Sequence, residues 1–294
     1  MFLVFMIVYH LPGANRNEFT THADGDVLDD FFEKTHLHDT AAGKFIRFMD
    51  NLLIKRNPGK NSLETAHLRS IKLRMKFTFL LTFSGLILAI IIGIPLGAIS
   101  AIRQGKAVDK VLSFISVILS ALPSYILAIL LVFLFSNALR LLPALGIDQG
   151  VKSFILPAIT IGAAGVALIS SMTRSAVLEI LDKPYVSVLR ANGIPSRRIL
   201  IIHILRNSLL SIISSLNVII SSLLCGSLIV ENFFSIPGIG QMVVEAISGR
   251  SQCLLLVSVG IIALTLMLLR IVTDLLSALV NPQVRAQMTG KKVL

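Results

Sequence analysis

The hydrophobic residues of this chain form long runs without charge, and short polar segments separate these runs. The runs equal or exceed the roughly 18 residues that an α-helix needs to cross a bilayer. They do not alternate between apolar and polar residues, as the strands of a membrane β-barrel would. The uncharged runs are residues 77–102, 111–136, 154–172 and 209–230, and a further run, 253–280, carries Arg270 and Asp274 towards its end. The pattern predicts an all-α polytopic membrane protein.

A shorter apolar stretch, residues 1–11, would cover about half of a membrane crossing before Pro12 and Gly13 end it. It lacks the basic start and the small-residue cleavage site of a signal peptide, so we expect a short first span and about six spans in total. A polar segment follows, and within it residues 45–54 have the pattern of an amphipathic helix on the membrane surface. The predicted organisation is a short span with an external polar segment over 1–76, a transmembrane domain over 77–285 and a cytoplasmic tail over 286–294.

The charges predict which side of the membrane each loop occupies. Only 15% of the residues are charged, and the net charge of +11 lies in loops, where the preference of basic residues for the cytoplasm explains it. No nucleic-acid-binding module is recognisable, so we expect no nucleic-acid partner. Loops 103–110 and 173–208 are basic and are expected in the cytoplasm, whereas 137–153 and 231–252 are expected outside.

Four basic residues do not fit this orientation, because they flank the outer end of the span at 77–102. They are Arg69, Lys72, Arg74 and Lys76. The two cysteines, Cys225 and Cys253, lie in or beside apolar runs and are expected to be small core residues without a disulfide.

The segment 185–210 is the most basic connection between two predicted spans and contains no acidic residue. Gly193 and Pro195 should end a helix there, and Ser196 can cap a second helix that begins at Arg197. Arginines at a helix start oppose the helix dipole. We therefore expect Arg197 and Arg198 to face an acidic partner surface or phospholipid headgroups, although a plain topology signal is the alternative explanation.

The chain has no recognisable energy source of its own. The nucleotide-binding pattern GxxxxGK[ST] is absent, and so are the Ser-His-Asp and HExxH arrangements of hydrolases and metalloproteases. Ionisable groups in mid-span would indicate a secondary transporter, and the uncharged runs have none. His203 and Asn207, four residues apart, share a helix face beside Arg206, where a structural hydrogen bond is expected and a metal site is not. A partner ATPase that binds the basic segment is the economical explanation.

Several separated motifs resemble one family, the permeases of bacterial ABC importers, and more narrowly the first-subunit type of the peptide/nickel group. The resemblance covers about residues 77–285 and includes IGIPLGAISAIRQG (92–105), SALPSY (120–125), ILPAIT (155–160), SSMTRSAVLEIL (170–181) and ENFFSIPGIGQM (231–242). The residues that match the cytoplasmic coupling motif are Tyr185, Arg190, Ala191, Gly193, Arg197, Arg198, His203, Arg206 and Asn207. Leu189 stands where a small alanine is usual, and the short first run departs from the family's full-length first span.

The resemblance implies a type I ABC-importer transmembrane domain that pairs with a second homologous permease as a heterodimer in the lipid bilayer of the cell membrane. Two cytoplasmic subunits would bind ATP and Mg²⁺, an external solute-binding lipoprotein or periplasmic protein would deliver the solute, and this chain would bind no cofactor and catalyse nothing. Residues 185–193 would form the coupling helix seated in the ATPase, with 193–195 as the bend. ATP-driven closure would then switch the spans between inward-open and outward-open states.

Two further groups of residues are candidates for a role in transport, one in the translocation pathway and one at the external mouth near the binding protein. Ser214, Asn217, Ser221 and Pro123 are candidates for the translocation pathway, although the spacing of the serines also suits helix packing and Pro123 also suits a simple kink. Glu231, Pro237, Gly238 and Gly240 are expected at the external mouth, as a turn with a re-entrant piece or as a turn of structural value alone. The family implies di- or oligopeptides as the solute, with nickel or a metal–chelator complex as the alternative. A stand-alone secondary transporter or channel is the alternative from another class.

Overall fold

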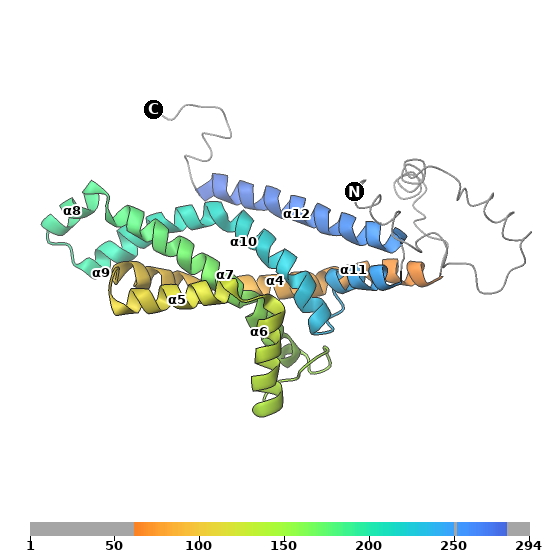
Figure 1. Cartoon of the computed structure of the whole chain (residues 1–294). Coiled ribbons are helices and arrows are strands. Elements are labelled where there is room, and N and C mark those ends of the chain that lie inside the picture. The colour runs from red at the N-terminus through yellow and green to blue at the C-terminus, as the bar shows by residue number, and fades with distance from the viewer. Residues whose placement is uncertain (1–61, 250–251, 281–294) are drawn as a thin grey trace, which may run out of the picture. The chain divides into compact units, whose positions relative to one another are not determined.

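The structure is a computed structural model that describes residues 62–249 and 252–280, in which every regular element is a helix. The chain divides into two compact units, whose described parts are 62–75 with 239–264 and 76–238 with 265–280. The helices, labelled in Figure 1, are α4 (Ser62–Ile102), α5 (Ala107–Ala121), α6 (Ser124–Leu131), the π-helix η1 (Val132–Ala138), α7 (Val151–Leu181), α8 (Pro184–Ala191), α9 (Ser196–Arg198), the π-helix η2 (Ile199–Leu205), α10 (Arg206–Phe233), α11 (Ile239–Ser248) and α12 (Gln252–Val280).

Three of the predicted spans coincide with described helices that are long and apolar enough to cross a membrane, namely Ser70–Ile102, Val151–Leu181 and Leu254–Leu275. The bent pair of helices over 107–138 gives a fourth if it is one span. The predicted run 209–230 lies inside α10. The predicted first span (1–11), the predicted amphipathic helix (45–54) and the predicted tail (286–294) lie outside the described residues.

The run 111–136, predicted as one span, is broken into two helices. α5 and α6 meet at a bend of 104° on either side of Leu122 and Pro123. Pro123 has no backbone N–H to continue the α5 ladder, and Leu122 before it takes an extended conformation, φ −72° and ψ 122°, as residues before proline do. The change of direction at Pro123 is therefore much larger than the simple kink that was expected.

The core of the larger unit forms where α4, α6, α7 and α10 meet. Its buried apolar side chains include Leu81 and Ala89 of α4, Leu156 of α7 and Ile219 of α10. On the outer surface of α4, α5 and α12, large hydrophobic side chains are exposed, for example Phe114 at 64% and Leu268 at 54%. Such surfaces suit lipid or a second membrane subunit rather than water.

Glycines in α4 let this helix approach α7 closely. A Cβ at Gly93 would lie 2.9 Å from the Cβ of Ile169, and a Cβ at Gly97 would lie 2.6 Å from the Cβ of Thr173. Although Gly93, Pro95 and Gly97 are residues that can loosen a helix, α4 is unbroken as far as Ile102. The role of the two glycines is close packing, as small residues serve at membrane helix interfaces.

We expect Gly97→Ala to destabilise the permease by roughly 2 kcal/mol, because the added methyl group would overpack the α4–α7 contact. The control is Gly226→Ala, since a Cβ there meets nothing within 4 Å. The thermal midpoint of the purified protein in detergent measures both. Equal midpoints for the two variants would contradict the proposed contact.

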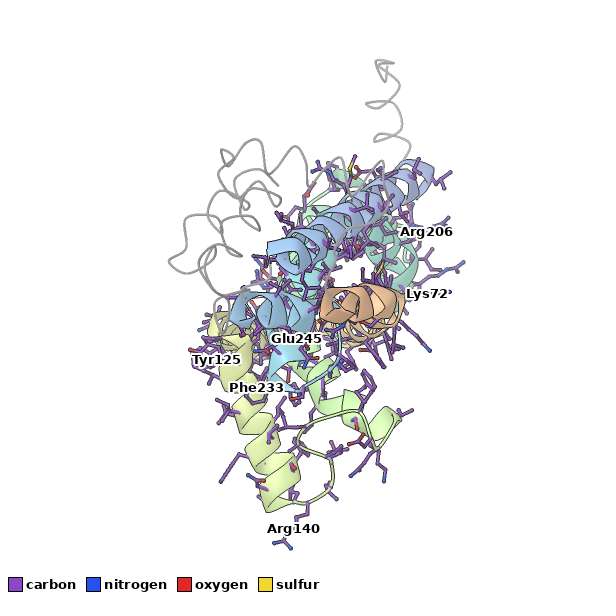
Figure 2. The ribbon with its side chains drawn as sticks, turned by 90° about the vertical axis from the view of Figure 1, so that its right-hand side faces the viewer. Lys72, Tyr125, Arg140, Arg206, Phe233 and Glu245 are labelled. Carbon is purple, nitrogen blue, oxygen red and sulfur yellow. The ribbon has the colours of Figure 1, made fainter. Side chains whose placement is uncertain are left out.

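The smaller unit accounts for one of the basic residues that did not fit the charge pattern. Arg74, 8% exposed, donates from Nη2 to Oε2 of Glu245 in α11 at 2.8 Å, and its Nε donates to the Ser70 hydroxyl at 3.1 Å. Figure 2 shows α11 with Glu245 beside the part of α4 that carries Lys72. The charge of Arg74 is thus neutralised by an acid from the segment 231–252. That segment and the outer end of α4 were both predicted to lie on the outer side of the membrane.

Candidate functional site

The basic segment after α7 folds into a short separate helix, α8. Pro184 occupies its first turn, where a missing N–H costs nothing. Its end is closed by two backbone bonds, from Gly193 N–H to the carbonyl of Arg190 (3.0 Å) and from Ile194 N–H to the carbonyl of Leu189 (3.3 Å). This pair is the Schellman motif, and Gly193 supplies the positive φ (75°) that the motif requires. The expected short helix with a bend at 193–195 is present.

α8 is held in place by its apolar side. Val186 is fully buried in a cluster with Ala101 of α4, Val177 of α7 and Ile204 of η2. Leu189, the residue that departs from the family pattern, packs partly buried against the same cluster. The opposite side of α8 leaves Tyr185 (39%) and Val188 (58%) exposed. α8 therefore presents a mixed apolar and basic surface on a fixed support.

Two residues of the predicted motif meet across this loop. The Asn207 side-chain amide donates to the hydroxyl of Tyr185 at 3.2 Å, which links the start of α8 to the start of α10. Arg190, Arg198 and Arg206 are exposed, as is Ala191. Figure 2 shows Arg206 pointing away from the helices. The side chain of Arg197 lies outside the described residues.

Two details of the predicted loop differ from the structure. Ser196 was expected to be the N-cap, but it is the first residue of α9. The N-cap position is occupied by Pro195, which is extended (ψ 136°) and makes no side-chain cap bond. His203 lies half-buried in the π-helix η2, and no hydrogen bond joins its ring to another described residue, so the expected structural hydrogen bond is not formed there.

Within the described part of the chain, a polar residue outside all of the predicted motifs, Asp109, is held by several hydrogen bonds. Its carboxylate accepts from Arg174 twice, from Nε at 2.8 Å and from Nη2 at 2.9 Å. It also accepts from the Ser100 hydroxyl at 2.6 Å and from the Gly105 backbone N–H at 2.9 Å. Asp109 is only 4% exposed. These bonds connect the end of α4, the start of α5 and the inner part of α7, which continues directly into α8.

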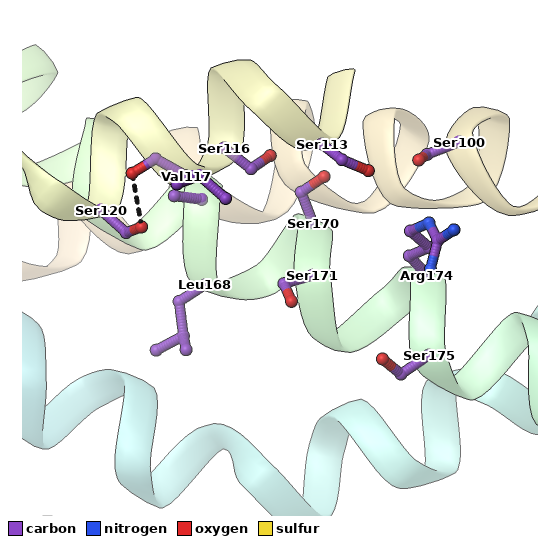
Figure 3. Close-up of a pocket in the computed structure, with 11 residues that line it drawn as sticks. Ser100, Ser113, Ser116, Val117, Ser120, Leu168, Ser170, Ser171, Arg174 and Ser175 are labelled. Carbon is purple, nitrogen blue, oxygen red and sulfur yellow. Dashed lines mark hydrogen bonds between the residues drawn. The ribbon is translucent and has the colours of Figure 1, made fainter. Parts of the chain in front are cut away.

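A cavity of about 300 Å³ opens beside this ion pair, between α4, α5 and α7. Seven of its eleven lining residues are serines, among them Ser113, Ser116 and Ser120 on α5 and Ser170, Ser171 and Ser175 on α7. Figure 3 shows the α5 and α7 serines on opposite sides of the space and Arg174 at one end. We call it the hydroxyl cavity.

The predicted pathway residues lie elsewhere. Ser214 and Asn217 are in α10, with side chains outside the described residues, and Ser221 is half-buried in the same helix. Pro123 is exposed at the break between α5 and α6. None of these four lines the hydroxyl cavity. The serines of α10 lie close together in one apolar run, which is why the sequence indicates this helix as pathway lining. The serines of the hydroxyl cavity come from segments far apart in the chain.

The predicted external-mouth residues form a tight buried turn after α10. Glu231 is fully buried, and its carbonyl accepts from Ile236 N–H at 2.9 Å. A Cβ at Gly238 would overlap the Glu231 carboxylate, so a larger residue there would require that side chain to move. Pro237 is half-buried in the turn, and Gly240 is buried in α11. Loop 139–150 also reaches this turn, since Gly146 N–H donates to the carbonyl of Phe234 at 2.9 Å.

No group of three or more His, Cys, Asp or Glu side chains that could hold a metal ion occurs within residues 62–249 and 252–280. The polar features considered for function are the basic loop around α8, the Asp109–Arg174 pair with its cavity, and the buried turn at Glu231.

Comparison with known proteins gives a consistent result. Residues 93–286 match the family described as "binding-protein-dependent transport system inner membrane component". The glutathione transport system permease protein GsiC of Pectobacterium atrosepticum is 30% identical over 287 residues, which cover 97% of this chain and 93% of that protein. GsiC of Escherichia coli K12 is 27% identical over 292 residues, covering 96% and 92%.

A solved structure shares the fold. An inward-facing conformation of the MetNI methionine ABC transporter matches with a TM-score of 0.63 at 16% identity, over 76% of this chain and 100% of that one. At this identity the likeness concerns the fold alone. It agrees with the predicted type I importer transmembrane domain.

Proposed function

This chain belongs to the family of binding-protein-dependent transport system inner membrane components and is a multi-pass ABC-importer permease subunit, and we propose that it moves di- or oligopeptides and receives its driving force through α8. The observation that carries the proposal is the construction of α8. Val186 fixes the helix to α4, α7 and η2, while Tyr185, Val188 and Arg190 remain exposed. A rigidly held helix with a free apolar and basic face suits docking to a partner protein.

The direct connection between α7 and α8 supports the same proposal. Only Asp182 and Lys183 separate the two helices, so a displacement of α8 is passed to a membrane-spanning helix through almost no flexible chain. In this proposal, two cytoplasmic ATP-binding subunits hold ATP and Mg²⁺ and press on α8. The bend at 193–195 carries the motion into α10. The loop 173–208 then lies in the cytoplasm, as its basic charge favours.

The remaining partners follow from the same proposal. A second homologous permease completes the translocation pathway, and an external binding protein, lipoprotein or periplasmic, delivers the solute. The exposed hydrophobic side chains of α4, α5 and α12 supply surface for the bilayer and for that second permease. Family membership sets aside the stand-alone transporter or channel.

Peptide is the proposed solute class. The relatives named for glutathione transport move a tripeptide derivative, and the polar lining described above consists of neutral hydroxyls and a closed ion pair. The alternative solute is nickel or a metal–chelator complex. A direct uptake assay that compares labelled tripeptide with labelled nickel chelate in the complete transporter distinguishes the two.

Docking through α8 predicts that reversing the charge of its basic surface separates the permease from its ATPase. We expect the double substitution Arg190→Glu and Arg198→Glu to reduce co-purification of the ATP-binding subunits at least tenfold, since rim charges set both attraction and register. The matched control is Lys152→Glu, an exposed charge reversal at the start of α7, within the segment 137–153 that is expected outside. Unchanged co-purification and uptake in the Arg190/Arg198 variant would refute docking through this surface.

A further inference from the structure

The hydroxyl cavity contains polar groups that the fold itself does not use. Elsewhere in the described chain, the hydroxyls of Thr82 and Thr173 are buried without a partner, whereas other buried hydroxyls bond to a backbone carbonyl of the preceding turn, as Thr160 does to Leu156 at 2.8 Å and Ser208 does to Ile204 at 2.9 Å. Such a bond satisfies the hydroxyl without a ligand. Ser170 is only 3% exposed, and its hydroxyl makes no hydrogen bond to a described residue.

Ser170 is directed into the cavity. It belongs to the lining, and Figure 3 shows its hydroxyl pointing towards α5, where Ser113 and Ser116 face it. A hydroxyl that opens into a cavity and has no partner in the described chain can exchange hydrogen bonds there with water or a ligand group. The hydroxyls of Ser116 and Ser171 likewise make no hydrogen bond to another described residue, which leaves free hydroxyls on both walls.

The charge of the cavity is close to neutral. Arg174 lies at one end, but both of its bonds to Asp109 are short, 2.8 and 2.9 Å, so its charge is already compensated. Serine hydroxyls donate and accept hydrogen bonds, as the N–H and C=O groups of a peptide bond also do. A volume of about 300 Å³ lies at the lower end of the range of small-molecule sites.

We propose that the hydroxyl cavity is a solute-contact site, in which serines of α5 and α7 exchange hydrogen bonds with the amide groups of the transported peptide. This inference rests on the proposed peptide-import function and assigns a site to it. The cavity adjoins the Asp109–Arg174 pair near the end of α7 that leads into α8, so a bound peptide lies beside the helix that the ATPase moves.

The test uses the complete transporter in proteoliposomes and compares threonine with valine at Ser116 and at Ser171. Threonine and valine have nearly the same shape, but only threonine keeps the hydroxyl. With radiolabelled glutathione and trialanine as probes, we expect each valine variant to raise the KM for uptake about three- to tenfold, which corresponds to one hydrogen bond. Each threonine variant should remain within twofold of the wild type.

The control is the same pair of substitutions at Ser84, whose hydroxyl bonds to the carbonyl of Leu81 at 2.8 Å and which does not line the cavity. There, threonine and valine should give equal KM values. Equal KM values for threonine and valine at both Ser116 and Ser171, with normal wild-type uptake, would overturn the cavity assignment alone. Failure of the wild type to import either peptide would overturn the proposed solute class instead.

A second measurement tests the cavity without valine or threonine substitutions, in case those variants do not assemble. In a background with Cys225→Ala and Cys253→Ala, the substitution Ser171→Cys introduces one thiol on the cavity wall. We expect an excess of trialanine to slow alkylation of this thiol at least threefold, and to leave the alkylation rate of Ser84→Cys unchanged. Alkylation of Ser171→Cys at the same rate with and without peptide would contradict binding in the cavity.

Discussion

Replacing Arg174 by alanine should destabilise the permease by roughly 3 kcal/mol or more, the cost of leaving one member of a buried ion pair without its partner. The larger share of this cost belongs to Asp109, whose side chain is 6% exposed against 31% for Arg174. Asp109→Asn should cost less, because Arg174 can turn towards solvent and asparagine can still bond to Ser100 and Gly105. Thermal unfolding of the purified permease in detergent would show this order.

Two comparisons identify the ion pair as the cause. Lys183→Ala removes a partner from the Lys183–Glu179 pair, whose atoms are 3.5 Å apart and whose side chains are 50% and 71% exposed, so a loss of about 0.3–0.5 kcal/mol is expected. The double variant Asp109→Asn with Arg174→Ala should be more stable than Arg174→Ala alone, because no buried charge is left. A double variant less stable than Arg174→Ala would contradict this account.

The Asp109–Arg174 pair shows what sequence inspection could not reach. From the sequence, Asp109 and Arg174 belong only to the basic loops 103–110 and 173–208. The two residues are 65 positions apart, so no local pattern joins them. The available signal was weak: an acid in the first turn of a helix, where the helix dipole favours it. Tertiary contact between α5 and α7 decides its role, and the positions of those helices depend on the glycines that let α4 pack against α7.

Features that depend only on residues near in sequence were easier to predict. The end of α8 at Gly193 and the interruption at Pro123 both follow from the backbone chemistry of glycine and proline, and both could be predicted. The size of the bend, 104°, could not be, because packing of α6 against α7 and α10 sets it. The π-helical turns of η2 also have no local sequence signal, and they displaced the simple helix expected from Arg197 onwards.

The second large effect is expected at the turn after α10, where Gly238→Ala should cost roughly 2 kcal/mol or more by overpacking. The added methyl group would overlap the Glu231 carboxylate, and that side chain has little room to move because Glu231 is fully buried. We expect a lower thermal midpoint and reduced yield of assembled transporter. Gly226→Ala again serves as the control, since a methyl group there meets open space.

A double-variant cycle separates steric overlap from a general weakness of this turn. Glu231→Ala alone should also destabilise the protein, because it removes a buried side chain and leaves a void. If overlap causes the Gly238→Ala effect, the double variant must be more stable than the sum of the two single effects predicts, by about 1–2 kcal/mol, since the alanine methyl group then occupies space that the carboxylate has left. Strict additivity would show instead that Gly238 is needed for the path of the backbone, and Glu231 would then have no part in the requirement for glycine.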